Sequence, residues 1–289
     1  NYAKEYYERV FQYFLDEYEK GRTPNPDVLC NREIKFDAFA KFARSFGADY
    51  IATGHYAKLE VKGDLNYLMQ AMDKDKDQTY FLNQLTNEQL ANVLFPLGDL
   101  NKKEVRLIAK AKGLKTADKK DSTGICFIGE RRFREFLSEY IPMRQGDIIT
   151  LDGKIVGTHE GVYYYTIGQR KGLGVGGGGN GEPYFVVKKD VINNVLYVSQ
   201  GESPELYSNI IEVDNFNYIP ESLSDGEYEV ECRIRHRQPL QKAKATVRGT
   251  RVSLEFFSPQ KGVAEGQYAV LYRGDYCIGG GVIERIIGK

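Results

Sequence analysis

The stretch "ADYIATGHY", residues 48–56, decides the fold predicted for the first half of the chain. It is a short apolar run that follows a helical pattern and closes on Gly54, as a buried strand of an α/β sheet does. Proteins with parallel sheets bind ligands at the carboxyl ends of their strands. We therefore expect Gly54 to lie at a ligand-binding edge, with His55 beside it as a base, a ligand contact or a capped core residue.

Helical patterns flank this strand on both sides. Apolar residues recur at intervals of three and four in residues 2–18 and again in residues 34–46, and both runs stop at glycines. A third helix begins with an Asn-x-x-Glu capping box, formed by Asn101 and Glu104. A short helix is predicted at residues 131–141.

The second half of the chain has the character of β structure. Asp-Gly turns and strand-like alternation begin after residue 143. The Gly-rich segment at 174–183 lacks a strand-Gly-helix context, which favours a hairpin loop over a phosphate-binding loop. The predicted domains are an α/β domain at 1–142, a central small β domain at 143–204 and a C-terminal β-barrel at 205–289.

Composition limits the classes of function. Lys+Arg and Asp+Glu number 40 each in 289 residues, so a nucleic-acid surface would have to be a local patch. Neither a membrane-length apolar run nor a signal peptide is visible in the sequence. The four cysteines and three histidines are dispersed, which argues against a disulfide scaffold or a metal site. We expect a cytoplasmic protein without a membrane association, whose thiols are kept reduced.

Two of the cysteines lie in polar surroundings. Cys30 follows the Pro-x-Pro segment of "TPNPDVLCNREIKF", where a stiff loop would expose the thiol near Asp27 and Arg32. Cys126 has basic residues on both sides, which favour the reactive thiolate. Burial as a small hydrophobe or in a core strand is the alternative for each. Two such thiols suggest a pair that works across an active site.

The other two cysteines, Cys232 and Cys277, alternate with apolar residues and are predicted to be core. Near the first of them lies a local basic patch, because "ECRIRHRQ" would place three arginines on one strand face. The next strand repeats the pattern with two lysines and an arginine. A surface on which positive charge dominates is suited to binding a phosphate backbone. The patch consists of Arg233, Arg235, Arg237, Lys242, Lys244 and Arg248. The charged stretch "KDKDQTYFL", residues 74–82, reads as a solvated loop.

Taken together, these segments resemble the tRNA-specific 2-thiouridylases. The matching stretches run in family order from near residue 21 to the C-terminus: "GRTPNPDVLCNREIKF", "ATGHYA", "KDQTYFL", "DSTGICFIGERRFREFL", "YTIGQRKGLGVGG", "RHRQ" and "CIGGGVIE". The resemblance implies a Rossmann-like adenine-nucleotide pyrophosphatase (PP-loop) domain, then a small β domain and a β-barrel. It implies ATP-dependent 2-thiolation of the wobble uridine in tRNAs for Lys, Glu and Gln.

The same resemblance implies roles for the paired thiols. Cys126 would carry a persulfide, and Cys30 would release its sulfur by attack, leaving a Cys30–Cys126 disulfide. Asp27 would be the acid-base group at the target base. ATP, with Mg²⁺, would adenylate the C2 oxygen, and a sulfur-relay protein or a cysteine desulfurase would supply the sulfur.

The resemblance also implies binding residues and a monomeric protein. Gly54 would lie at the adenylate. The tRNA contacts would come from Asn25, Pro26, Asp27, His55, Lys76, Asp77, Gln78, Arg235, His236 and Gln267.

One departure concerns the phosphate-binding loop of the family, Ser-Gly-Gly-Val-Asp-Ser-Ser, which does not occur in residues 1–289. Since the sequence also starts at Asn1 inside a helical pattern, we expect that an N-terminal segment precedes it and that the fragment alone does not hydrolyse ATP. Two other classes of function stay open. One is a non-catalytic tRNA-binding module, and the other is a redox protein that uses Cys30 and Cys126 as a regulatory pair.

Overall fold

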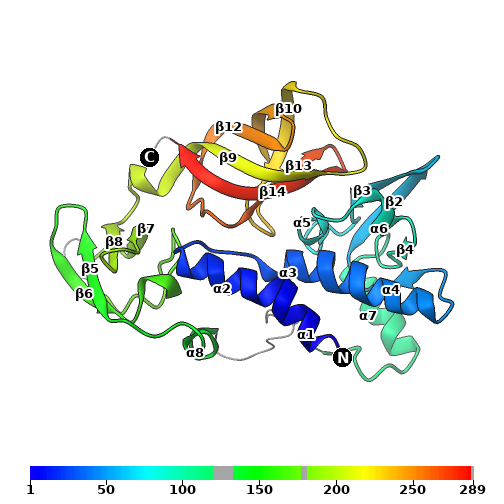
Figure 1. Cartoon of the computed structure of the whole chain (residues 1–289), viewed down its shortest axis with the longest axis horizontal. Helices are drawn as coiled ribbons and strands as arrows, with labels where there is room; N and C mark the ends of the chain where they lie inside the picture. The colour runs from blue at the N-terminus through cyan, green and yellow to red at the C-terminus, as the bar shows by residue number, and fades with distance from the viewer. Residues whose placement is uncertain (120–132, 177–180, 288–289) are drawn as a thin grey trace.

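The computed structural model describes residues 1–119, 133–176 and 181–287. Cys126 lies outside these residues. Helices of the first half run along one side of the molecule, a small sheet lies at one end, and a barrel of long strands covers the helices (Figure 1).

The first helical run packs the aromatic stripe seen in the sequence. It consists of α1 (Ala3–Tyr6), the π-helical η1 (Tyr7–Phe11) and α2 (Gln12–Glu19). Its buried side chains include Val10, Phe11, Phe14 and Tyr18. The run ends at Gly21, which has a φ of +75°, a value that glycine adopts without strain.

The second helical run differs from the prediction at its start. It is continuous through α3 (Pro26–Leu29), the π-helical η2 (Cys30–Ala38) and α4 (Phe39–Ser45). Pro26 occupies the first helical turn, where its missing N–H costs nothing and its fixed φ favours the helix. Cys30 is therefore part of a helix, and the expectation of a thiol presented by a Pro loop is wrong.

The predicted strand is part of a short parallel pair. The pair consists of β1 (Ile51–Ala52) and β4 (Val93–Leu94). The same part of the chain contains α5 (Thr79–Leu82), α6 (Asn87–Leu90) and α7 (Lys102–Ala111). The helix α8 (Phe133–Ser138) lies elsewhere, against the first helical run, where the Phe136 ring is 5.6 Å from that of Phe11 (Figure 1). The capping box of α7 is confirmed, since Asn101 Oδ1 accepts from the Glu104 N–H at 3.0 Å and the Glu104 carboxylate accepts from the Asn101 N–H at 2.7 Å.

The second half is all β, as predicted. The central sheet has the order β6-β5-β8-β7 and contains β5 (Gly146–Thr150), β6 (Ile155–His159), β7 (Tyr184–Asp190) and β8 (Val195–Gln200). Short 3-10 helices, η3 (Val162–Tyr164) and η4 (Pro204–Leu206), flank its strands.

The C-terminal strands close into a barrel, which residues 207–287 describe without a gap. Its order is β13-β10-β11-β12-β9-β14, and pairing of β13 with β14 closes the ring. The strands are β9 (Tyr207–Tyr218), β10 (Gly226–Arg233), β11 (Gln241–Arg248), β12 (Arg251–Lys261), β13 (Tyr268–Arg273) and β14 (Tyr276–Ile287). Cys232 and Cys277 are buried, which confirms the prediction that they are core.

A hairpin from the first half of the chain extends the barrel sheet. It is formed by β2 (Ala57–Lys62) and β3 (Leu65–Gln70), and β3 pairs with β14 where Met69 faces Tyr276. The α/β part and the barrel therefore share one continuous sheet, a connection that the sequence pattern did not predict.

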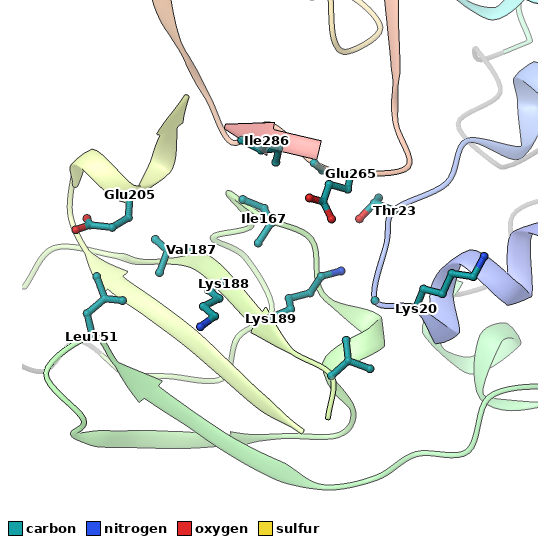
Figure 2. A pocket seen from close by; sticks show the side chains of 13 residues that line it. Lys20, Thr23, Leu151, Ile167, Val187, Lys188, Lys189, Glu205, Glu265 and Ile286 are labelled. Carbon is teal, nitrogen blue, oxygen red and sulfur yellow. The ribbon is translucent and has the colours of Figure 1, made fainter. Parts of the chain in front are cut away.

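The three parts of the chain meet around a pocket of about 430 Å³ (Figure 2). Thr23 comes from the segment before Pro26, Lys189 from β7, and Glu265 from the barrel. The figure shows Thr23 and Glu265 close together on one side of this pocket. Burial lowers the pKa of Lys189 to about 8, and its ammonium donates to the Tyr165 carbonyl at 2.9 Å.

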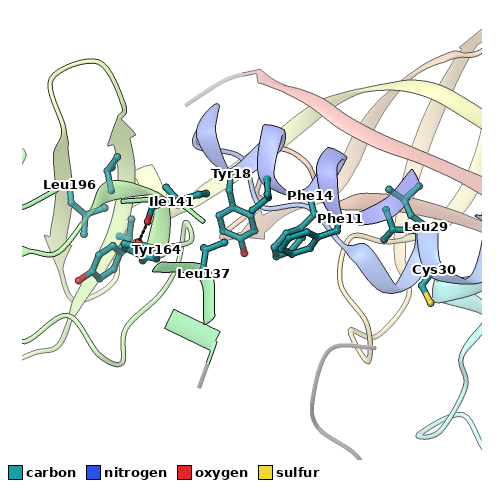
Figure 3. Close-up of a cluster of buried hydrophobic side chains, with 14 of the residues drawn as sticks. Phe11, Phe14, Tyr18, Leu29, Cys30, Leu137, Ile141, Tyr164 and Leu196 are labelled. Atoms are coloured by element: carbon teal, nitrogen blue, oxygen red, sulfur yellow. Dashed lines mark hydrogen bonds between the residues drawn. The ribbon is translucent and has the colours of Figure 1, made fainter. Parts of the chain in front are cut away.

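An apolar cluster joins the first helical run to the central domain (Figure 3). Phe11 and Phe14 lie between Leu29 and Cys30 on one side and residues of α8 and the central sheet on the other. The Tyr164 hydroxyl donates to the Ile141 carbonyl at 2.6 Å within this cluster. The Cys30 thiol is therefore packed into a core that spans two parts of the chain.

Candidate active site at the start of the Pro26 helix

The start of the helix brings a carboxylate and a thiol together. Asn25 has an extended backbone, and the helix begins at the next residue. Asp27 and Cys30 are three residues apart, so their side chains lie on the same helical face. Asp27 is half-buried, whereas Cys30 is completely buried. The carboxylate is thus at the rim of the site and the thiol lies beneath it.

The strand edge supplies an open backbone position next to this helix. Gly54 follows β1 and is exposed, and a Cβ placed on it would meet only Leu97, at 4.0 Å. A ligand can therefore approach the backbone closely here. The ring of His55 lies 5.7 Å from that of Phe36, which connects the strand edge to the helix that carries Cys30.

His55 behaves as a neutral core residue. Its side chain is 9% exposed, and its Nδ1 lies 2.9 Å from the Thr53 hydroxyl. Burial, with a smaller contribution from Lys35, lowers the pKa of His55 to about 3. Near neutral pH the imidazole therefore provides hydrogen bonding and no positive charge for a phosphate.

The segment before α5 is not the solvated loop that its charges indicated. Asp77 is 1% exposed, and its carboxylate accepts from the Ala71 N–H at 2.8 Å and the Thr79 hydroxyl at 2.6 Å. Arg233 lies 3.2 Å from the same carboxylate. Burial raises the pKa of Asp77, and the hydrogen bonds and Arg233 counteract this effect. The predicted tRNA contact of Asp77 would require its side chain to leave these partners.

The neighbours of Asp77 hold the segment against the strand edge. Gln78 accepts from the Tyr56 N–H at 2.9 Å through its side chain, and its own N–H donates to the Tyr56 carbonyl at 2.8 Å. Lys76 is half-buried. The structure thus holds Gln78 against Tyr56, the residue that follows His55.

The predicted arginine patch does not form on one strand face. β10 ends at Arg233, which is buried, and Arg237 has a φ of +64° in the turn that follows. The period-2 pattern therefore stops where the patch was expected to begin. The prediction is wrong because it treated the segment as one extended strand.

The next strand has the predicted alternation but a mixed charge. Lys242 and Lys244 alternate with buried alanines on β11. Lys242 pairs across the sheet with Glu231, and Lys244 lies 2.9 Å from Glu227. The single-sign face inferred for this strand is therefore also wrong, since acidic residues on β10 offset the lysines.

The turn after β10 lies near α5. The His236 ring is 4.5 Å from that of Phe81, and burial followed by the charges of Arg237 and Arg233 lowers the pKa of His236 to about 4. Arg235 is exposed and its guanidinium donates to the Gly262 carbonyl. This turn therefore presents the charge of Arg235 together with a neutral imidazole.

Gln267 lies against the segment that leads to the Pro26 helix. Its Nε2 donates to the Thr23 carbonyl at 2.7 Å, and its Oε1 lies 3.4 Å from the Tyr80 hydroxyl. Gln267 and Arg233 are thus among the barrel residues that contact the candidate site. Sequence patterns did not indicate the buried contacts of Arg233 and Tyr80, because the partners of both residues are distant in sequence.

Comparison with known proteins agrees with this architecture. The tRNA methyl transferase HUP domain matches residues 1–130, the tRNA methyl transferase PRC-barrel domain matches 134–200, and the aminomethyltransferase beta-barrel domain matches 208–283. The chain is therefore a HUP (PP-loop) protein with two β domains, which confirms the predicted fold class.

Curated relatives specify the family. The tRNA-specific 2-thiouridylase MnmA of Bacillus licheniformis is 52% identical over 99% of this chain and 77% of its own length. The enzymes of the same name from Halalkalibacterium halodurans and Bacillus subtilis are also 52% identical, over 100% and 99% of this chain and 78% and 77% of their own lengths. The chain belongs to the family of tRNA-specific 2-thiouridylases. Among the helices of the described residues, none has the length and apolarity that crossing a membrane requires.

Proposed function

We propose that this protein forms 2-thiouridine at the wobble position of tRNAs for Lys, Glu and Gln, in an ATP-dependent reaction. The observation that carries the proposal is the placement of Asp27 and Cys30 on one helical face, beside the open backbone at Gly54. Relatives at 52% identity carry the name of this activity.

The chemistry requires an activated oxygen and a soft nucleophile. ATP, with Mg²⁺, supplies the activation of the uridine C2 oxygen, which is otherwise a poor leaving group. Gly54 fits beside the nucleotide because a side chain there would occupy the space that the ligand needs. The PP-loop class of the first domain agrees with the use of ATP.

The two thiols divide the sulfur transfer between them. Cys126 carries the persulfide, and its terminal sulfur becomes bonded to C2 while AMP leaves. Attack of the Cys30 thiolate on the inner sulfur of Cys126 breaks the persulfide bond and forms a Cys30–Cys126 disulfide. A cellular dithiol then reduces this disulfide before the next turnover.

Asp27 is the acid-base group at the target base, held at the rim of the site by the first helical turn. Asn25 and Pro26 contact the same nucleotide, which has to leave its stack to reach them. Further tRNA contacts come from His55, Lys76, Gln78, Arg235 and His236.

The remaining parts of the proposal concern partners and organisation. The sulfur comes from a relay protein or a cysteine desulfurase, and the enzyme acts as a cytoplasmic monomer. The chain divides into a catalytic domain at 1–142, a central domain at 143–204 and a barrel at 205–289, with the hairpin of β2 and β3 reaching across to the barrel.

A non-catalytic tRNA-binding module is the second candidate. Complete burial of the Cys30 thiol favours it, because a buried thiol cannot attack a partner until it is uncovered. In that case neither Cys30 nor Cys126 would matter for the function of the protein.

The test measures 2-thiouridine by mass spectrometry of digested tRNA. The full-length protein is incubated with ATP, unmodified tRNA and a cysteine desulfurase with cysteine. We expect product from the wild type and from Cys232→Ala, the matched control in the barrel core. Cys126→Ser and Cys30→Ser should give none. Equal product from all four proteins would exclude the two-thiol scheme, and tRNA binding without product from any would leave the binding module.

A further inference from the structure

Thr23 is held by the barrel at both of its backbone polar groups. Its N–H donates to the Glu265 carbonyl at 2.8 Å, and its own carbonyl accepts from Gln267 Nε2 at 2.7 Å. Thr23 lies four residues before Asp27 in the sequence. One loop of the barrel, residues 263–267, thereby fixes the start of the segment that leads to the candidate active site.

The Gln267 side chain is itself fixed in orientation. Its Oε1 lies 3.4 Å from the hydroxyl of Tyr80, a residue with no exposed surface, and that hydroxyl also lies 3.1 Å from the Tyr268 carbonyl. The Gln267 carbonyl accepts from the Ile283 N–H at 2.7 Å. With its oxygen directed to Tyr80, the side-chain amide can offer only its nitrogen to Thr23.

Neighbouring contacts strengthen the attachment. Arg22 donates to the Ile283 carbonyl at 3.0 Å and forms an ion pair of 2.8 Å with Glu284. Gly266 allows the close approach, because a Cβ on it would lie 3.0 Å from the Thr23 nitrogen. Residues 22 and 23 are therefore bound to the barrel at several separate points.

The segment between this attachment and the helix is stiff. Pro24 and Pro26 have fixed φ angles, and only Asn25 lies between them. A displacement of Thr23 is therefore passed on to the first helical turn instead of being absorbed by loop motion. That turn carries Asp27, and Cys30 follows directly.

We propose that Gln267 is a positioning residue for thiolation, which holds Thr23 so that Asp27 and Cys30 stand correctly at the target base. The inference rests on the proposed function and assigns to Gln267 a task within the protein in addition to the predicted contact with tRNA. The Thr23 carbonyl takes one N–H of the side-chain amide, and the second N–H stays available for a contact with RNA.

Kinetics separate positioning from tRNA contact. In Gln267→Glu an oxygen replaces the nitrogen that faces the Thr23 carbonyl, while the shape is kept. The single-turnover rate at saturating tRNA should fall about 10- to 100-fold, because misplacement by about 1 Å has effects of this size. The Kd for tRNA reports on the lost N–H donor and the added negative charge, so the rate at saturating tRNA is the quantity that reports on positioning.

Two further variants serve as a second test and as a control for this measurement. Tyr80→Phe removes a hydroxyl that cannot reach RNA, and it should lower the same rate in the same direction, with an unchanged Kd for tRNA. Gln145→Glu makes the same chemical change at an exposed position of the central domain and should leave both quantities unchanged. A raised Kd with a normal rate at saturation in Gln267→Glu would overturn the proposal in favour of direct tRNA contact.

Hydrogen exchange tests the attachment without any activity. In Gln267→Glu, amides in peptides covering residues 22–30 should exchange faster than in the wild type, whereas those of β11 and β12 should not change. Unchanged exchange in residues 22–30 would overturn the inference. A wild-type protein that makes no 2-thiouridine would instead remove the proposed function, and the exchange result would still decide whether Gln267 fixes this segment.

Discussion

Asp77 and Arg233 form a buried ion pair between residues that are 156 positions apart, with an Oδ1–Nη1 distance of 3.2 Å. Their side chains are 0% and 7% exposed. The guanidinium also lies 5.4 Å from the centre of the Tyr272 ring. The pair joins the segment before α5 to the end of β10, and it thus links two regions for which tRNA contacts are proposed.

Loss of either charge of this ion pair should lower the stability of the folded protein. Arg233→Met leaves the Asp77 carboxylate buried without a counterion, and we expect a loss of about 3–5 kcal/mol in the free energy of unfolding. The double variant Asp77→Asn/Arg233→Met removes both charges and should recover a large part of that loss. Urea denaturation of the three proteins measures it, and equal losses in the single and double variants would contradict a charge-based role.

The buried histidine makes stability depend on pH. The pKa of His55 is about 3 in the folded protein and 6.5 as a model value, so the unfolded chain binds the extra proton between these values. Stability should therefore fall as pH decreases below about 6.5, by up to about 1.4 kcal/mol per pH unit for this one group.

The variant His55→Gln removes this titration and should flatten the dependence. Urea denaturation over the range from about pH 6.5 to about pH 4 gives the slope. His236→Gln is the comparison, since the pKa of His236 is about 4 and its titration has the same sign over a shorter range. Identical slopes in the wild type and His55→Gln would show that the imidazole is not buried in solution.

The two barrel thiols should be unreactive. Burial raises the pKa of Cys277 to about 12 and that of Cys232 further still, so the thiolate is scarce at mildly alkaline pH. Iodoacetamide should modify neither residue in the native protein and both in concentrated guanidinium chloride. Peptide mass spectrometry reads the result, and rapid native modification of Cys232 would mean that the barrel opens.

The glycines of "CIGGGVIE" allow β14 to approach β9. A Cβ on Gly279 would lie 1.9 Å from the Asn217 carbonyl oxygen, and its φ is +123°. Gly274 has a φ of +59° with no atom within 4 Å of such a Cβ. Gly279→Ala should therefore cost about 1–3 kcal/mol more than Gly274→Ala in urea denaturation, because only the first adds a clash to the backbone strain. Equal losses of unfolding free energy in the two variants would mean that β9 moves to make room for the added methyl group.

Local patterns were sufficient to predict much of the fold. The capping box at Asn101, the parallel strand before Gly54 and the run of barrel strands each depend on residues close together in sequence. The start of the second helix was missed because Pro26 can interrupt a helix or begin one, and the neighbouring residues do not distinguish these cases.

The site was harder to predict because residues that interact there are distant from one another in sequence. Arg233 looked exposed among alternating arginines, whereas its counterion Asp77 comes from the first half of the chain. Lys242 and Lys244 do point outward, but the acidic residues that oppose them lie on the neighbouring strand. Charge patterns along one strand therefore say little about the net charge of a sheet surface.

The pairing of β3 with β14 has a consequence for synthesis of the protein. Met69 can pair with Tyr276 only after residue 276 has been translated. The edge of β3 that pairs with β14 therefore stays uncovered while the ribosome makes the intervening residues. Joining of the α/β part to the barrel sheet is therefore a late event, and a ribosome that stalls before residue 276 leaves this edge of β3 without its partner strand.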